Sequence, residues 1–286
     1  MPDQQTIEHL KDKALEMRKN LLKLCHYGGW LHVGGDLSIT DVMTVIFEYM
    51  LHVDPARVDW EERDRFILSK GHGAGALYMS MANKGFFEPK EIFRTYGKLG
   101  TRFGMHPCRD ELPGVEMSTG SLGHGLSIAV GLALSAKLKK QAHRVVAVMG
   151  DGECDEGTVW EGAMAAAHYK LGNLTAFVDK NGLSLDGFTK DIMNIEPLDE
   201  KFSSFGWNVV NLDGHDVAAL VDVVDNLPPV TTEKPTVVIA KTVKGKGVAF
   251  MENNYKWHAG TVDEETLKEC CAELDTKRES ERTLQP

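Results

Sequence analysis

The chain has 286 residues, of which 42% are hydrophobic and 26% charged, so it is long enough to bury a substantial core in one or two domains. Acidic residues outnumber basic ones by 42 to 32, giving a formal net charge of -10. This balance argues against nucleic acid and anionic membranes as partners. We find no export signal and no apolar run of membrane-spanning length. Five cysteines without CxxC spacing predict neither disulfides nor a zinc site, and we expect a cytoplasmic protein.

The first predicted element is an amphipathic helix that ends near Gly28 and Gly29. Its apolar residues recur at steps of four and three, and the chain beyond it places His32 in a loop. Short apolar runs follow at 144–149, 174–179, 207–212 and 236–243. Because these runs lack polar alternation, they are typical of strands in a parallel sheet that is buried on both faces.

The segments between these runs have helical composition and the length of crossover connections, notably 156–172 and 216–227. Residues 263–280 predict a final charged amphipathic helix. We therefore expect an α/β fold with a mostly parallel sheet and helices on both faces. It forms one domain over 1–286, with a helical extension at about 263–286. In such sheets, ligands bind beyond the carboxyl ends of the strands.

The most informative motif follows the run at 144–149, where Asp151 lies between Gly150 and Gly152. Asn181 comes thirty residues later, after one predicted helix and one strand, so both side chains should emerge at the same sheet edge. A carboxylate oxygen, an amide oxygen and the Leu183 carbonyl would suit a hard cation such as Mg²⁺. The glycines would let the backbone approach phosphate oxygens near a helix N-terminus. Taken separately, these motifs are ordinary turns.

The spacing from Gly-Asp-Gly to Asn resembles the motif of thiamin diphosphate enzymes. The resemblance implies that Asp151, Asn181 and the Leu183 carbonyl bind the metal, with Gly152 and Asn181 next to the cofactor diphosphate. Lys180 departs from the family pattern, which often has Asn or Asp there, but this position does not supply a ligand.

Further motifs place histidines on separate loops. They are His32, His72 in LSKGHG, His106 in MHP and His258 in WHAG, together with the segment TGSLGHG at 119–125. A lone loop histidine is more often solvated or a helix cap than catalytic. Together, however, the motifs resemble transketolase from about residue 10 to 262.

The transketolase resemblance implies a role for each matching position. His72 would contact the diphosphate, and the backbone of Gly120, Ser121 and Leu122 would lie against the cofactor rings. His32 and His106 would face the substrate, while His258 would serve both cofactor and substrate. Glu156 would hydrogen-bond to the catalytic glutamate of a neighbouring domain. We assign His32, His106 and His258 to proton transfers, because an unperturbed imidazole has a pKa near 6.5.

A full-length transketolase continues with a pyrimidine-binding domain and a third domain, whereas this chain stops at Pro286. The resemblance therefore implies the N-terminal subunit of a two-chain transketolase, inactive alone and assembled as α2β2 with a complementary C-terminal subunit. It would bind thiamin diphosphate and Mg²⁺ and transfer a two-carbon ketol unit from a ketose to an aldose. Pentose phosphates are the default substrates, and sulfosugars or branched sugars remain open.

Three alternatives compete with this interpretation. Another thiamin diphosphate enzyme, such as a 2-oxo acid dehydrogenase α subunit or deoxyxylulose phosphate synthase, is disfavoured by the histidine motifs. A nicotinamide-dependent dehydrogenase is disfavoured because no GxGxxG opens a helix. A regulatory subunit that binds the cofactor without catalysis remains open.

Overall fold

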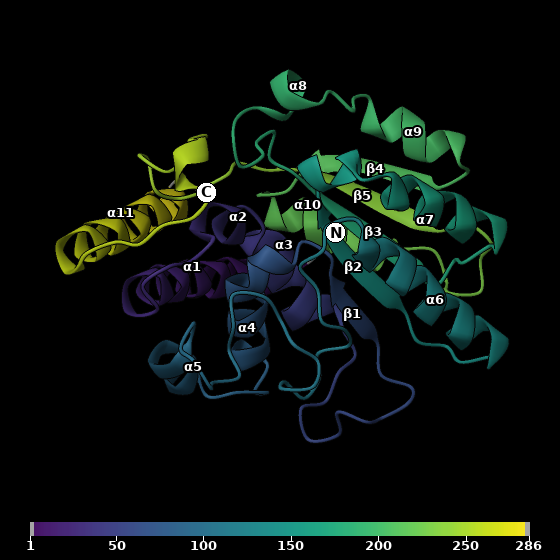
Figure 1. The fold of residues 1–286 in the computed structure, drawn as a ribbon, viewed down its shortest axis with the longest axis horizontal. Coiled ribbons are helices and arrows are strands. Elements are labelled where there is room, and N and C mark those ends of the chain that lie inside the picture. Colours follow the sequence, from purple (N-terminus) through teal and green to yellow (C-terminus); the bar gives the residue numbers. More distant parts are fainter. Residues whose placement is uncertain (1–2, 284–286) are drawn as a thin grey trace.

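The computed structural model describes residues 3–283 of the chain. Helices and strands alternate along it, as the sequence predicts (Figure 1). The longer elements are α1 (Gln4–Tyr27), α2 (Val33–Ser38), α3 (Thr40–Val45), β1 (Arg65–Leu68), α4 (Ala74–Asn83), α5 (Pro89–Thr95), α6 (His124–Leu138), β2 (Val145–Gly150), α7 (Gly157–His168), β3 (Leu174–Lys180), α8 (Thr189–Ile192), α9 (Leu198–Ser204), β4 (Asn208–Asp213), α10 (Val217–Asp225), β5 (Thr236–Lys241) and α11 (Glu264–Thr283). Single turns of other helix types are η1 (Ile46–Met50), η2 (Gly71–Gly73), η3 (Gly152–Asp155) and η4 (Tyr255–Trp257).

The centre of the fold is a five-stranded sheet in the order β1-β2-β3-β5-β4, and every neighbouring pair is parallel. Gly150 at the end of β2 pairs with Asp179 near the end of β3. Consequently, the loops that follow these two strands leave the sheet at the same edge, where the motif at 150–152 meets the motif at 181–183.

Helices cover both faces of the sheet, and each face has its own hydrophobic cluster (Figure 1). Val146 and Val148 of β2 point toward α1, α3, α4 and α10, whereas Val145 and Ala147 point toward α6, α7 and α9. Successive side chains of β2 are thus buried on opposite faces of the sheet. Because both faces are covered, the strand sequences show no polar alternation. The predicted α/β fold with helices on both faces is confirmed.

The final helix, α11, packs along α1 and is joined to it by ion pairs. Arg278 reaches Glu8 and Asp12, while Lys19 pairs with Asp275. The predicted C-terminal helix is therefore present through Thr283, and the rest of the predicted extension lies outside the described residues. Between residues 3 and 283, none of the helices is long and apolar enough to cross a membrane.

Candidate active site at the strand ends

The two strand-end motifs meet as the sequence predicts. Oδ2 of Asp151 accepts a hydrogen bond from the Gly182 amide at 2.7 Å, and Oδ1 accepts one from the Gly152 amide at 2.9 Å. Oδ1 of Asn181 accepts the Leu183 amide at 3.0 Å. The three predicted metal-binding residues therefore share one corner of the sheet edge.

The electrostatics of this corner favour a cation. Burial, followed by the nearby charge of Asp179, raises the pKa of Asp151 to about 6, so a positive charge placed there would stabilise the carboxylate. Residues 3–283 contain no group of three or more His, Cys, Asp or Glu side chains suited to a metal ion. A cation bound at Asp151 would thus complete its shell with amide, carbonyl, phosphate or water oxygens, as Mg²⁺ commonly does.

The backbone beside Asp151 leaves room for a ligand. A Cβ built at Gly150 would meet no protein atom closer than 3.8 Å, and one at Gly152 none closer than 3.5 Å. Neither glycine is therefore required by protein packing. Helix α7 begins at Gly157, and the N-terminal ends of helices attract anions. These features fit the phosphate end of a cofactor.

Next to the Asp151 corner lies a buried ion pair that the sequence analysis missed. Nζ of Lys70 lies 2.6 Å from Oδ2 of Asp179, and the two side chains are 2% and 0% exposed. Ser38, Asn181 and Thr242 also donate to the Asp179 carboxylate. Burial alone would raise the pKa of Asp179, but Lys70 and the hydroxyls of Ser38 and Thr242 hold it below its usual value. Asp179 thereby fixes the orientation of the Asn181 side chain.

A second buried lysine, also missed, reaches the same corner. Nζ of Lys244 lies 3.1 Å from the Leu183 carbonyl, 2.8 Å from the Ser184 carbonyl and 2.8 Å from Nδ1 of His258. Burial, with a contribution from Lys70, lowers the pKa of Lys244 to about 8. A protonated lysine can only donate, so Nδ1 of His258 accepts. The Leu183 carbonyl is thus shared with an ammonium group but keeps a second lone pair for a cation.

The four predicted histidines come together although they lie on four separate segments. The His32 ring is 5.4 Å from His72, 6.0 Å from His106 and 5.5 Å from His258 between ring centroids, and His72 is 5.4 Å from His258. Nδ1 of His32 is buried without a protein partner. The cluster therefore contains a buried polar nitrogen that no group of the described residues satisfies.

The acidity of these histidines differs from the value assumed in the sequence analysis. Burial, together with neighbouring positive groups, lowers the pKa to about 4 for His32, about 2 for His72 and about 3 for His258. Burial also lowers the pKa of His106. These imidazoles are consequently neutral near pH 7, so each has one accepting and one donating nitrogen. They are suited to accept and return a hydroxyl proton, and they do not carry a permanent positive charge.

The loop containing Gly120 is locked against its neighbours. A Cβ at Gly71 would lie 2.6 Å from the Gly120 nitrogen, and a Cβ at Gly120 would lie 2.9 Å from the His106 ring. Gly120 also has φ +147°, which disfavours other residues. The predicted cofactor loop thus contacts the segments that carry His72 and His106.

The remaining predicted positions lie at the outer rim of the site. Ser121 is exposed, Leu122 is half-buried, and Oγ of Ser121 lies 3.3 Å from Nδ1 of His124. Glu156 is exposed at the N-cap of α7, and its Cβ would lie 2.5 Å from a Cβ at Gly123. The exposed Glu156 therefore lies directly next to the 121–123 loop.

Glu153, which the sequence analysis did not single out, joins three of the site loops. One carboxylate oxygen accepts the Gly123 amide at 2.8 Å and the Ser69 hydroxyl, and the other accepts the Gly150 amide at 3.0 Å. The residue is 3% exposed. Its contacts hold together the segments that carry His72, Gly120 and Asp151.

The missed residues share a weak sequence signal. Lys70, Asp179 and Lys244 lie within or just after apolar strands, and Glu153 follows the Gly-Asp-Gly turn. A charged residue directly at the end of a buried strand is a candidate for burial with a partner. Nothing in the local sequence, however, identifies which distant residue is that partner.

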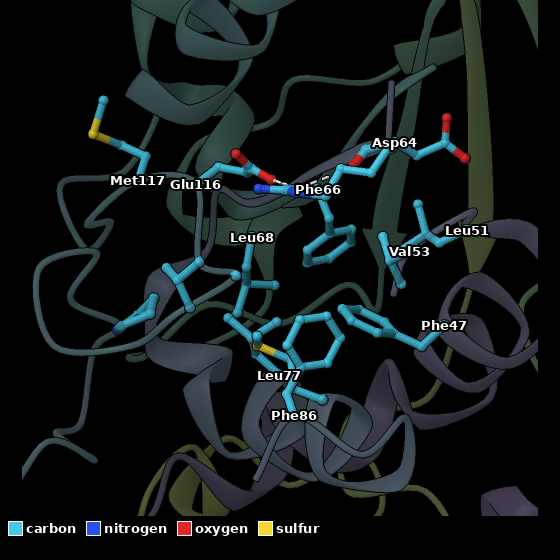
Figure 2. A pocket seen from close by; sticks show the side chains of 15 residues that line it. Phe47, Leu51, Val53, Asp64, Phe66, Leu68, Leu77, Phe86, Glu116 and Met117 are labelled. Atoms are coloured by element: carbon cyan, nitrogen blue, oxygen red, sulfur yellow. Dashed lines mark hydrogen bonds and ion pairs between the residues drawn. The ribbon is translucent and has the colours of Figure 1, made fainter. Parts of the chain in front are cut away.

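A separate small cavity, whose lining includes Leu77 and Met117, lies between the side chains drawn in Figure 2. It has a volume of about 20 Å³, and its walls include the apolar side chains of Phe47, Phe66 and Phe86. Its polar boundary includes Glu116, which pairs with Arg63. This space is about the size of one water molecule and is lined mostly by apolar side chains, so we do not assign it to the site.

Comparison with known proteins agrees with this geometry. Residues 26–281 match the family described as "Transketolase, thiamine diphosphate binding domain". The chain is 37% identical over 273 residues to one of the subunits of the apulose-4-phosphate transketolase of Phocaeicola vulgatus, covering 96% of each chain. It is 40% identical over 266 residues to the 6-deoxy-6-sulfo-D-fructose transketolase subunit SqwG of Clostridium sp., covering 93% of this chain and 96% of that protein.

Solved transketolases have the same fold. The Campylobacter jejuni enzyme superposes with a TM-score of 0.84 at 25% identity, over 96% of this chain and 43% of the other. A variant of the Pichia stipitis enzyme gives 0.86 at 28% identity, over 94% and 40%. The chain spans less than half the length of these solved transketolases. It belongs to the transketolase family and corresponds to the N-terminal, thiamine diphosphate-binding domain, the part that its relatives from Phocaeicola and Clostridium carry as a separate polypeptide.

Proposed function

We propose that the chain is the cofactor-anchoring subunit of a two-chain transketolase, which moves a two-carbon ketol unit from a ketose to an aldose. The observation that carries this proposal is the convergence of two features at one sheet edge. The Asp151 corner suits a cation with a diphosphate, and the four neutral imidazoles suit a polyhydroxylated substrate. Both features follow from residues far apart in the sequence.

In this proposal, Asp151, Asn181 and the Leu183 carbonyl hold Mg²⁺ against the diphosphate, and Gly152 leaves the space for it. The metal is needed because a diphosphate beside buried carboxylates would otherwise face strong repulsion. Lys244, which reaches the same loop, adds positive charge. When bound, thiamin diphosphate supplies the carbon nucleophile that takes up the two-carbon unit.

The histidines supply the polar contacts next to the proposed Mg²⁺ and diphosphate site. We place His72 next to the diphosphate and His258 between cofactor and substrate. His32 and His106 face the substrate, where neutral imidazoles accept a hydroxyl proton and return it. The backbone of Gly120, together with Ser121 and Leu122, lies along the cofactor rings.

The proposal includes a complementary C-terminal subunit with the pyrimidine-binding domain, in an α2β2 assembly. Support comes from the relatives that are themselves named as transketolase subunits, which this chain matches over nearly their whole length. The exposed carboxylate of Glu156 would meet the partner's catalytic glutamate. Because Glu156 lies next to the 121–123 loop, the same contact would shield the cofactor rings from water.

We propose a cytoplasmic enzyme that acts on sugars or sugar phosphates. The free cysteines, including the buried Cys25 and Cys154, suit a reducing compartment. The named relatives act on apulose 4-phosphate and on 6-deoxy-6-sulfo-D-fructose. Branched sugars and sulfosugars therefore join the pentose phosphates as donor candidates for this chain.

The test is a reconstitution assay. The purified chain, with saturating thiamin diphosphate and Mg²⁺, should give no two-carbon transfer from a panel of ketoses. Adding a chain that carries the complementary domains should produce transfer to an aldose acceptor. Full activity of the single chain would refute the two-chain proposal. Cofactor binding without turnover, with every partner tried, would favour a regulatory subunit.

A further inference from the structure

A buried ion-pair network lies outside the site described above. The guanidinium of Arg18 on α1 donates to both carboxylate oxygens of Asp41 on α3, at 2.9 and 2.5 Å. Oδ2 of Asp41 also lies 2.8 Å from Nδ1 of His215, which precedes α10. Arg18 and Asp41 are 8% and 5% exposed. Burial alone would raise the pKa of Asp41, but Arg18 and His215 hold it well below its usual value.

The second ring nitrogen of His215 connects this network to the site. Nε2 lies 2.9 Å from the Val243 amide nitrogen. Because a backbone amide can only donate, Nε2 must accept, and the ring proton must lie on Nδ1, facing Asp41. The Arg18–Asp41 pair thus selects the tautomer of His215 that can hold the Val243 backbone.

The residues on either side of Val243 both reach the candidate active site. Thr242 donates its hydroxyl to the Asp179 carboxylate, while Lys244 donates to the carbonyls of Leu183 and Ser184 and contacts His258. The Val243 amide lies between these two anchors. A displacement of residue 243 would therefore move both Thr242 and Lys244 relative to the Asp151 corner.

We propose that His215 is a positioning residue, which fixes Lys244 through the Val243 amide and is itself oriented by Asp41 and Arg18. The inference rests on the proposed function, because it assigns the consequence of that positioning to cofactor binding. An ion pair that only joined α1 to α3 would be complete without His215. The geometry instead directs the accepting nitrogen of His215 at a loop whose next residue lies in the site.

The first experiment measures the contact directly, without cofactor. Hydrogen exchange of the amides at 242–246 is followed in the full chain for wild type, His215→Ala, His215→Gln and His9→Ala. His9 is an exposed histidine on α1 and serves as the matched control. We expect exchange of the Val243 amide to rise about tenfold or more in His215→Ala only. Glutamine should retain protection, because its side-chain oxygen can accept the amide. Unchanged exchange in His215→Ala would overturn the proposal.

The second experiment is a double-mutant cycle in the assembled two-chain complex, with thiamin diphosphate affinity measured by calorimetry in the presence of Mg²⁺. We expect His215→Ala and Lys244→Met each to weaken binding about tenfold, and the double variant to be within about twofold of Lys244→Met alone. Additive losses, near a hundredfold in the double variant, would mean a general structural role and overturn the positioning role. If wild type bound no cofactor, the proposed function would fail, while the exchange result would still decide whether His215 holds Val243.

Discussion

Removal of the Glu153 carboxylate should loosen three loops at once. In Glu153→Ala, the amides of Gly123 and Gly150 and the hydroxyl of Ser69 lose their acceptor inside the protein. An unsatisfied buried polar group costs about 1–3 kcal/mol, so the two amides alone predict a loss of about 2–6 kcal/mol in the free energy of unfolding. Burial raises the pKa of Glu153, which shows that the carboxylate is itself desolvated at a cost. We therefore expect the lower half of that range.

The assay is urea unfolding of the purified chain, followed by circular dichroism. Glu153→Gln keeps one oxygen for Gly123 and Ser69 but turns an amide donor toward the Gly150 amide, so we expect a smaller loss of about 1–2 kcal/mol. Glu161→Ala, an exposed carboxylate on α7, is the matched control and should be neutral. If Glu153→Ala and Glu161→Ala unfolded at the same urea concentration, the hydrogen bonds of Glu153 would not stabilise the three loops, and its assigned role would be wrong.

Three further predictions concern the site. Asp151→Ala should abolish Mg²⁺-dependent binding of thiamin diphosphate, as measured by calorimetry on the complex with and without chelator, and wild-type affinity would contradict the metal assignment. His72→Ala should raise the cofactor requirement, whereas His32→Ala and His106→Ala should lower kcat by about 10²–10⁴-fold with cofactor bound; recovery at saturating cofactor would refute a substrate-side role. The lowered pKa values of His32, His72 and His258 mean that only the unfolded chain takes up protons just below pH 6.5. The histidine contribution to stability should thus be full well above pH 6.5 and fall between pH 6.5 and 4, whereas Asp36 and Asp151, whose pKa values burial raises to about 7 and about 6, contribute in the opposite direction. The urea midpoint of wild type should therefore fall more steeply with decreasing pH than that of His32→Gln, and equal slopes would count against the buried neutral state.

The sequence was sufficient for four of the five strands and for the meeting of the two strand-end motifs, but the edge strand β1 (Arg65–Leu68) was not among the predicted runs. Apolar runs such as 144–149 could be recognised because both faces of the sheet are covered, and the parallel order brings residues 151 and 182 to one edge. The four histidines were found because each lies in a short recognisable motif. Their roles in catalysis and cofactor binding remain predictions.

The sequence was insufficient wherever a partner lies far away in the chain. Lys70 and Asp179 are 109 residues apart and Ser69 and Glu153 are 84 apart, and charged side chains of this kind usually lie at the surface. The burial of the histidines could not be predicted from the sequence either. This burial lowers their pKa below the value assumed for a free imidazole. Both are properties of tertiary packing, which no local pattern encodes.

The contact between the loops at Gly71 and Gly120 has a consequence for engineering. Backbone meets backbone there, and a Cβ at Gly71 would lie 2.6 Å from the Gly120 nitrogen, while one at Gly125 would lie 2.3 Å from the Ser69 hydroxyl. Neither loop can change shape without the other. A chimera that takes the 69–73 segment from a relative should therefore take residues 119–125 from the same donor.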